Sequence, residues 1–163
     1  MVANTKQYPM VFTFPQVIVG NGFSARVEIH GRALLVEDDG DVWIHGVQPG
    51  GFAGGGESYG KACHEFRVSY QSVLYDIAQE AQSFDGFRAQ IEEFFSTVND
   101  AYSAEWELAL SAVRKNDTAL AGFNKVPAES RPVKIKVTQL DNRSMRPDLN
   151  QFDKFEIAQD KAA

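Results

Sequence analysis

The sequence predicts an α+β fold, in which two helices pack on one face of an antiparallel β-sheet. Apolar and polar residues alternate along residues 23–29 and again along residues 133–137, which is the period of a half-buried strand. Between these runs, apolar residues recur every three or four positions over residues 62–113, which is the period of a helix. Strands that precede helices, with one strand returning afterwards, are typical of the α+β class.

Length and composition predict one globular domain. The chain has 163 residues, so we expect a single domain with a core at residues 23–140 and a tail or edge strand at 141–163. The formal net charge of −6 argues against a general binder of nucleic acid or anionic membranes, because such binders need clustered Lys and Arg. Cys63 is the only cysteine, which excludes an intramolecular disulfide.

The N-terminal residues do not resemble a signal peptide. Pro9, Thr13, Pro15 and Gln16 interrupt the apolar run, and a single Lys6 precedes it. No stretch approaches the roughly 18–20 apolar residues that a membrane-spanning helix needs. Together with the single thiol, these features predict a cytoplasmic protein without a membrane partner.

The strands are predicted in the first third of the chain. Gly31 is expected to end the strand at residues 23–29, and residues 33–36 begin the next one. Asp39-Gly40 can take positive φ at both positions of a two-residue turn, so a hairpin is predicted there. Five glycines in residues 48–56 leave room only for a short edge strand at residues 51–54.

Two helices follow the strands. Ser58 offers an N-cap hydroxyl for the first, and the second is expected over residues 87–113, about seven turns long. The apolar stripe of this long helix carries more large aromatic side chains than one small sheet face requires. We therefore expect a homo-oligomer, with Tyr102 and Trp106 in the contact between copies.

Motifs that would indicate catalysis are weak. Residues 55–62 fit the GxxxxGK spacing of a phosphate loop, but Ala62 stands where Ser or Thr must hold magnesium. Cys63 lacks a facing base, because its neighbour His64 points about 100° away on a helix. Three histidines lack the spacing typical of a zinc helix: His30, His45 and His64. We therefore predict no enzyme, and no catalytic, cofactor-binding or metal-binding residue.

Four carboxylates gather at the tip of the predicted hairpin, on Glu37, Asp38, Asp39 and Asp41. The twelve-residue spacing of a calcium loop is missing. Two interpretations stay open, a solvated hairpin tip and an acidic contact for a basic partner. The charge is also unevenly distributed further along the chain, since residues 76–107 hold eight acidic residues against one arginine. This asymmetry has the same two interpretations, a solvated surface and a contact for a basic partner.

Residues 33–82 contain a longer pattern. The pattern begins with a strand, the Asp39-Gly40 turn and a second strand. Next comes the Pro49-Gly50 approach to a short third strand. It ends with the Gly56-Glu57-Ser58 helix entry and the early small residue Ala62. This stretch resembles the HicB-like antitoxin family. The resemblance implies a small sheet packed on one helix, an acidic module that often oligomerises, and a small basic toxin as partner. An N-terminal strand and the long second helix are extra to the family pattern.

The resemblance also bears on DNA binding. Members of the family commonly carry a separate DNA-binding domain, but only 23 residues follow Leu140, too few for a helix-turn-helix, so direct DNA binding is doubtful. The resemblance thus implies a non-enzymatic binding protein, similar to a HicB-type antitoxin, that neutralises a small basic RNA-targeting toxin through protein-protein contacts, for which we expect the hairpin carboxylates to be the partner-binding residues. Two alternatives stay open: a stand-alone oligomeric structural or phage or plasmid accessory protein, and a small-molecule binder at the glycine-rich loop.

Overall fold

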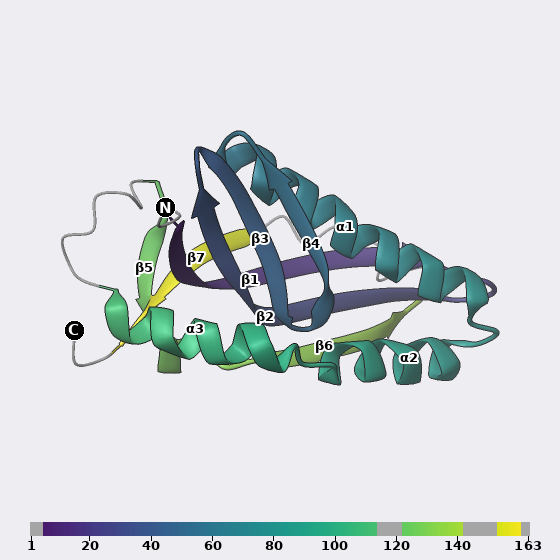
Figure 1. The fold of residues 1–163 in the computed structure, drawn as a ribbon. Coiled ribbons are helices and arrows are strands. Elements are labelled where there is room, and N and C mark those ends of the chain that lie inside the picture. Colours follow the sequence, from purple (N-terminus) through teal and green to yellow (C-terminus); the bar gives the residue numbers. More distant parts are fainter. Residues whose placement is uncertain (1–4, 114–121, 142–152, 161–163) are drawn as a thin grey trace.

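The computed structural model describes residues 5–113, 122–141 and 153–160 (Figure 1). Its helices are α1 (Tyr59–Glu80), α2 (Phe84–Ser96) and α3 (Asp100–Ala112), with a 3₁₀ turn at Ala128–Ser130. Its strands are β1 (Thr5–Val19), β2 (Ser24–Asp38), β3 (Asp41–Gln48), β4 (Gly50–Gly56), β5 (Asn124–Pro127), β6 (Lys134–Leu140) and β7 (Lys154–Gln159). The predicted α+β class, with a mostly antiparallel sheet, is confirmed.

All seven strands belong to one sheet. Their order is β4-β3-β2-β1-β7-β5, and β6 pairs with β2 outside this path. β2 is long enough to take two successive partners on one edge: residues 24–30 pair with β6 and residues 32–38 with β3. Its other edge pairs with β1 along its whole length. β1 and β2 are therefore the central pair of strands, with which most of the other strands pair.

Gly31 lies inside β2 and does not end a strand. A Cβ on Gly31 would stand 2.5 Å from Cζ of Phe12 and 2.6 Å from the carbonyl oxygen of Gln48. The prediction of two separate strands at residues 23–29 and 33–36 is therefore wrong. Glycine is required here by the close approach of a ring and a carbonyl group, and not by a turn.

The core extends beyond residues 23–140. Four side chains of β1 are at most 2% exposed: Met10, Phe12, Phe14 and Ile18. β7 lies between β1 and β5, so residues 154–159 are neither a tail nor an edge strand, while residues 142–152 and 161–163 lie outside the described part. β5 occupies the outer position beside β7.

The single long helix expected at residues 87–113 is two helices, α2 and α3. The residues between them are fastened to the turn that joins β3 to β4. The N–H of Asn99 donates to the carbonyl oxygen of Val47 at 2.9 Å, and the N–H of Gly50 donates to that of Thr97 at 2.8 Å. Tertiary hydrogen bonds therefore stabilise the break.

The helices pack on opposite faces of the sheet, because their buried side chains belong to two separate cores. α1 and α2 cover one face, here called the α1 face, and α3 lies on the other, the α3 face. The α1 face carries the larger core, which is rich in aromatic rings, including Phe12, Phe14, Phe52, Phe66, Tyr70 and Phe87. The α3 face carries a smaller one, formed by Val11, Leu34, Val47, Trp106, Ala109, Val126 and Ala158. Two helices on one face agree with the prediction, and the third was not expected.

Glycines in β4 let α1 pack directly on the sheet. A Cβ on Gly54 would stand 2.1 Å from the backbone nitrogen of Phe66. The ring of Trp43 lies against Gly55 on the other side, 2.5 Å from where its Cβ would stand. The glycine-rich segment is therefore a seven-residue strand and not an open loop. Among the described residues, no helix has both the length and the apolar character that a membrane span requires.

Candidate functional site

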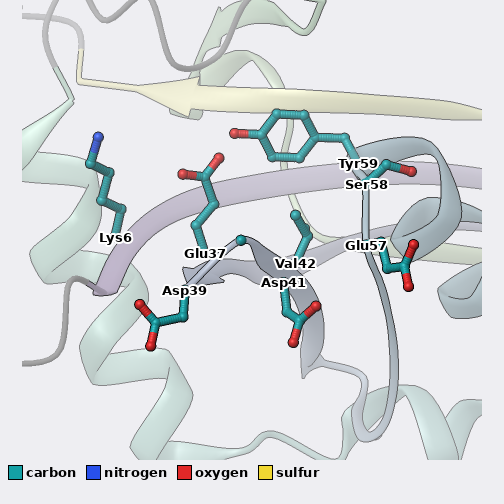
Figure 2. A pocket seen from close by; sticks show the side chains of 9 residues that line it. Lys6, Glu37, Asp39, Asp41, Val42, Glu57, Ser58 and Tyr59 are labelled. Atoms are coloured by element: carbon teal, nitrogen blue, oxygen red, sulfur yellow. The ribbon is translucent and has the colours of Figure 1, made fainter.

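The acidic hairpin tip lies beside the beginning of α1, and a pocket of about 400 Å³ opens there (Figure 2). Four of its residues carry carboxylates, and one carries an ammonium group. The lining residues are Lys6, Glu37, Asp39, Gly40, Asp41, Val42, Glu57, Ser58 and Tyr59. We call this cavity the acidic pocket.

The hairpin turn sets the position of three of the carboxylates. Asp39 and Gly40 have φ of 50° and 87°, and Asp38 pairs with Asp41 across the turn, so the predicted two-residue hairpin is confirmed. β1 then aligns Lys6 with Glu37 as direct neighbours. The tight turn thus presents several acidic side chains within one short stretch of sheet.

The beginning of α1 supplies the other wall. The Ser58 side chain accepts a hydrogen bond from the backbone N–H of Lys61 at 3.1 Å, so the predicted N-cap is confirmed. Glu57 precedes this cap and lines the pocket. The partial positive charge at a helix N-terminus stabilises nearby carboxylates, which offsets part of the repulsion among them.

The carboxylates line the pocket without converging on one point. In Figure 2, Glu37 extends toward the side where Lys6 and Tyr59 lie, whereas Asp39 and Asp41 extend to the opposite side of the hairpin. No group of three or more His, Cys, Asp or Glu side chains in the described ranges could hold a metal ion. The arrangement therefore suits a partner with several separated positive charges better than a single bound cation.

Three of the four predicted partner-binding residues line the pocket, namely Glu37, Asp39 and Asp41. Asp38 is exposed at the end of β2, outside the lining. Sequence reasoning missed Glu57, although the Gly-Glu-Ser helix entry was visible in the pattern. Its contribution depends on α1 packing beside the hairpin tip, which a linear pattern does not show.

An aromatic stack lies next to the hairpin tip, on the α3 face. Trp43 stacks on His45 with ring centroids 6.2 Å apart, and His45 stacks on Tyr102 of α3 at 4.6 Å. Trp43 is 47% exposed and lies two residues beyond Asp41 on the same face of β3. Burial lowers the pKa of His45, and the nearby Glu105 opposes this shift. The exposed indole offers an apolar contact beside the carboxylates.

The proposed oligomer contact must be corrected at Trp106. This side chain is 1% exposed, and its indole N–H donates to the carbonyl oxygen of Met10 at 3.1 Å. The Arg32 guanidinium lies over the ring, 4.2 Å from its centroid. Trp106 therefore belongs to the core of its own chain, and Tyr102 is half-buried against His45. The many aromatic side chains of residues 87–113 are explained by two helices, α2 and α3, which pack on opposite faces of the sheet.

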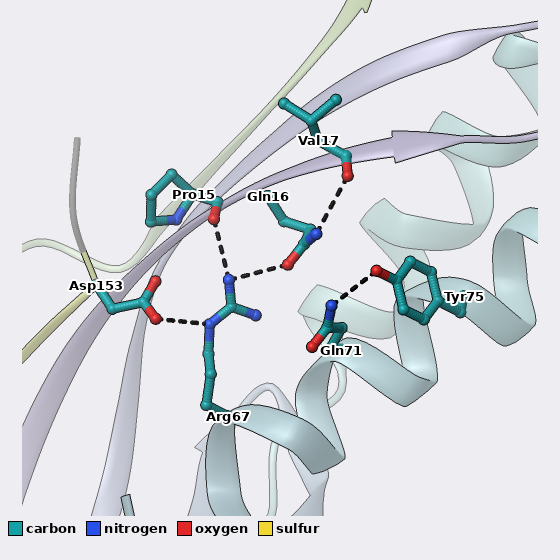
Figure 3. Close-up of polar contacts among 7 residues, drawn as sticks. All are labelled: Pro15, Gln16, Val17, Arg67, Gln71, Tyr75 and Asp153. Carbon is teal, nitrogen blue, oxygen red and sulfur yellow. Dashed lines mark hydrogen bonds and ion pairs between the residues drawn. The ribbon is translucent and has the colours of Figure 1, made fainter. Parts of the chain in front are cut away.

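A polar cluster around Arg67 has a structural role (Figure 3). Arg67 of α1 donates to the carbonyl oxygen of Pro15 at 3.0 Å and to Oε1 of Gln16 at 2.9 Å, both in β1. Its Nε donates to Asp153, just before β7, at 3.0 Å. Arg67 therefore joins one helix to two strands. Cys63, also on α1, is half-buried, and burial raises its pKa to about 11, so it remains a thiol.

Comparisons with known proteins do not assign a family. The chain matches no protein-family model, and neither a curated protein nor a solved structure matches it. The function is therefore argued from the geometry and charge of the site.

Proposed function

We propose that this protein is a non-enzymatic binding protein whose acidic pocket binds a basic surface of a protein partner. The observation that carries the proposal is the gathering of Glu37, Asp39, Asp41 and Glu57 around one cavity. Each is an acceptor for the ammonium or guanidinium groups of a partner. Their spread over both sides of the hairpin fits several Lys or Arg side chains at once.

The neighbouring Trp43 supports a protein partner. Tryptophan is enriched among residues that dominate binding energy at protein interfaces, because it buries a large rigid surface. Here the ring is 47% exposed and is held in place by His45 and by the glycine beneath it. A rigid apolar side chain beside a cluster of charges has the composition of an interface core with a polar rim.

We further propose that the partner is a small basic toxin, as in the HicB-like antitoxins. The supporting observations are the order β2-β3-β4-α1 along the chain, with α1 packed on one face of these strands, and the acidic turn between β2 and β3. The proposed location is the cytoplasm. Charge complementarity would speed the association of the two proteins and select against acidic competitors.

Binding to the acidic pocket is tested with a lysine- and arginine-rich peptide as probe. We expect salt-sensitive binding by titration calorimetry, accompanied by a change in Trp43 fluorescence. The variant Glu37→Gln/Asp39→Asn/Asp41→Asn should bind at least about tenfold more weakly, because it removes three charge-assisted contacts.

The matched control removes three carboxylates elsewhere. Asp76→Asn/Glu80→Gln/Glu93→Gln changes the net charge equally, and all three residues are exposed on α1 or α2. This variant should bind the peptide as the wild type does. Equal weakening of both variants would show that only net charge matters, and would overturn a specific role for the pocket.

The antitoxin assignment is tested by co-expression. If a short basic open reading frame adjoins this gene, its product should arrest growth when expressed alone, and co-expression of this chain should restore growth. The pocket variant Glu37→Gln/Asp39→Asn/Asp41→Asn should fail to restore it. Full rescue by that variant would separate neutralisation from the pocket and would overturn the assignment.

The two alternative functions differ in support. A small-molecule site in the glycine-rich segment is disfavoured, because Gly54 and Gly56 face Phe66 and Lys61 of α1, and Trp43 covers Gly55. These contacts fill the space that a ligand would need. An oligomeric accessory role remains a proposal, and it is favoured by basic side chains on the α3 face of the sheet, at Arg26, Lys134 and Lys136.

A further inference from the structure

α3 covers only part of its face of the sheet. The area covered by α3 ends at Arg32. The Arg32 guanidinium lies over the Trp106 ring of α3, and Nη1 of Arg32 lies 3.4 Å from Oε1 of Glu107. From Arg32 toward the beginning of β2, strands β1, β2 and β6 lie side by side. No described helix covers them on this face. The register aligns Thr13, His30 and Lys134 in one row, and Pro15, Glu28 and Lys136 in the next.

This uncovered area is basic. Lys134 and Lys136 project from β6, Arg26 from β2 and Lys154 from β7, where Lys154 pairs in register with Thr13. We call these four residues the basic sheet face. Alternation along β7 places Lys154 on the same side as Ala158, which belongs to the α3-face core.

Most of these positive charges lack an internal partner. Glu28 is shared, because it lies 3.7 Å from Arg26 and 3.6 Å from His30. Within the described ranges, no carboxylate forms an ion pair with Lys134, Lys136 or Lys154. No described carboxylate therefore neutralises these three charges, and carboxylates of a second molecule can pair with them.

The charge on this area also acts on His30. Burial lowers the pKa of His30, Lys134 and Arg131 lower it further, and Glu28 opposes the shift. Arg131 is itself held by Glu156, with 2.9 Å between Nε and Oε1. A positive potential over the open half of the sheet is consistent with both observations.

The occupant of this area is argued from charge and shape. Face-to-face pairing of two copies is disfavoured, because it would place like charges together. Nucleic acid is disfavoured by the net charge of −6 and by the carboxylates at the hairpin tip. The same chain, however, carries a concave surface of opposite sign in its acidic pocket, and lysine side chains are long enough to enter a cavity of about 400 Å³.

We propose that the basic sheet face binds the acidic pocket of a second copy of this chain, head to tail. The inference rests on the proposed function, because it uses the same pocket and names a basic group that fills it. A heterologous contact of this kind leaves one free pocket and one free basic sheet face on every pair. Association therefore continues into rings or open chains, and a basic protein partner competes with it for the pocket.

Self-association is tested by sedimentation velocity of the full chain over a range of concentrations. We expect the wild type to form assemblies larger than a monomer at low salt, and to dissociate at high salt. Lys136→Glu and Asp41→Lys each place a like charge in the contact, and each should weaken association at least about tenfold.

Mixing these two variants gives the decisive measurement. Lys136→Glu keeps an intact pocket, and Asp41→Lys keeps an intact basic sheet face, so association should return in the mixture although each variant alone is monomeric. Control variants with the same charge changes elsewhere, Arg88→Glu and Asp76→Lys, should associate as the wild type does. Both lie on helices of the α1 face.

Two results would overturn the inference: a wild type that stays monomeric at low salt, or variants that remain separate on mixing. Peptide binding to the pocket distinguishes this failure from failure of the proposed function. A monomer that still binds the lysine- and arginine-rich peptide loses only the head-to-tail contact. A monomer that does not bind the peptide loses both.

Discussion

The two faces of the sheet are covered to different extents. On the α1 face, α1 and α2 enclose a large aromatic core, in which Phe66 contacts the rings of Phe12, Phe14, Phe52 and Phe155. On the α3 face, α3 covers a smaller core, and no other helix in the described part of the chain covers the area that carries Arg26, Lys134 and Lys136. The difference indicates that the α1 face supplies most of the folding free energy, whereas the α3 face and the hairpin end present the binding surfaces.

The largest expected effect tests whether the smaller core, on the α3 face, stabilises the folded protein. Trp106→Ala should lower the free energy of unfolding by about 3–5 kcal/mol, because it leaves a cavity under α3 and removes the hydrogen bond to Met10. Urea unfolding followed by circular dichroism measures the change. An unchanged unfolding free energy together with altered self-association would show that Trp106 faces a second copy after all.

A second prediction concerns the closest contact on the α1 face. Gly54→Ala should cost about 1–3 kcal/mol, because the new methyl group would meet the backbone of Phe66, which cannot rotate away. The control is Gly60→Ala in the first turn of α1, where nothing lies within 4 Å of the added Cβ. That change should stabilise the protein by about 0.5–1 kcal/mol, since alanine is the better helix former. Similar effects of both substitutions would mean that α1 does not approach β4 closely.

The sequence predicted local features well and non-local ones poorly. The Asp39-Gly40 turn and the Ser58 cap are encoded by adjacent residues, and both are confirmed. The local pattern at Gly31 predicts a strand end, because the actual role of this glycine, the close approach of Phe12 and Gln48, depends on residues 17 and more positions away. The position of β7 between β1 and β5 likewise depends on pairing between the two ends of the chain.

The helix break shows the same limit. Apolar residues continue at helical spacing through the break, so periodicity alone predicts one helix, while the hydrogen bonds to Val47 and Gly50 that hold the break are tertiary. This error produced the second one, because a single helix would expose aromatic side chains that two helices bury. At the candidate site, the hairpin carboxylates were predicted from sequence, but Glu57 and Lys6 join them only through packing.

A third prediction addresses the break directly and has a moderate expected effect. The Asn99 side chain accepts a hydrogen bond from the N–H of Tyr102 at 3.1 Å and so caps α3. Asn99→Ala should therefore lower the free energy of unfolding by about 1 kcal/mol, whereas Asn99→Asp keeps an acceptor and should cost much less. Thermal unfolding of the two variants measures the difference. Equal losses would indicate that the backbone contact to Val47, and not the cap, fixes the beginning of α3.

The smallest expected effect is a change in how the free energy of unfolding depends on pH. It tests whether α3 keeps His45 buried on the covered part of the α3 face. Burial lowers the pKa of His45, against the opposing effect of Glu105, so the folded protein binds this proton less tightly than the unfolded chain does. The free energy of unfolding therefore falls as the pH drops through the ordinary value of 6.5, and levels off below the folded-state pKa. His45→Gln removes this contribution, so urea unfolding should show a smaller loss of stability between about pH 7.5 and about pH 5.5 than in the wild type. A variant that loses stability as steeply as the wild type would show that cover by α3 does not control the protonation of His45.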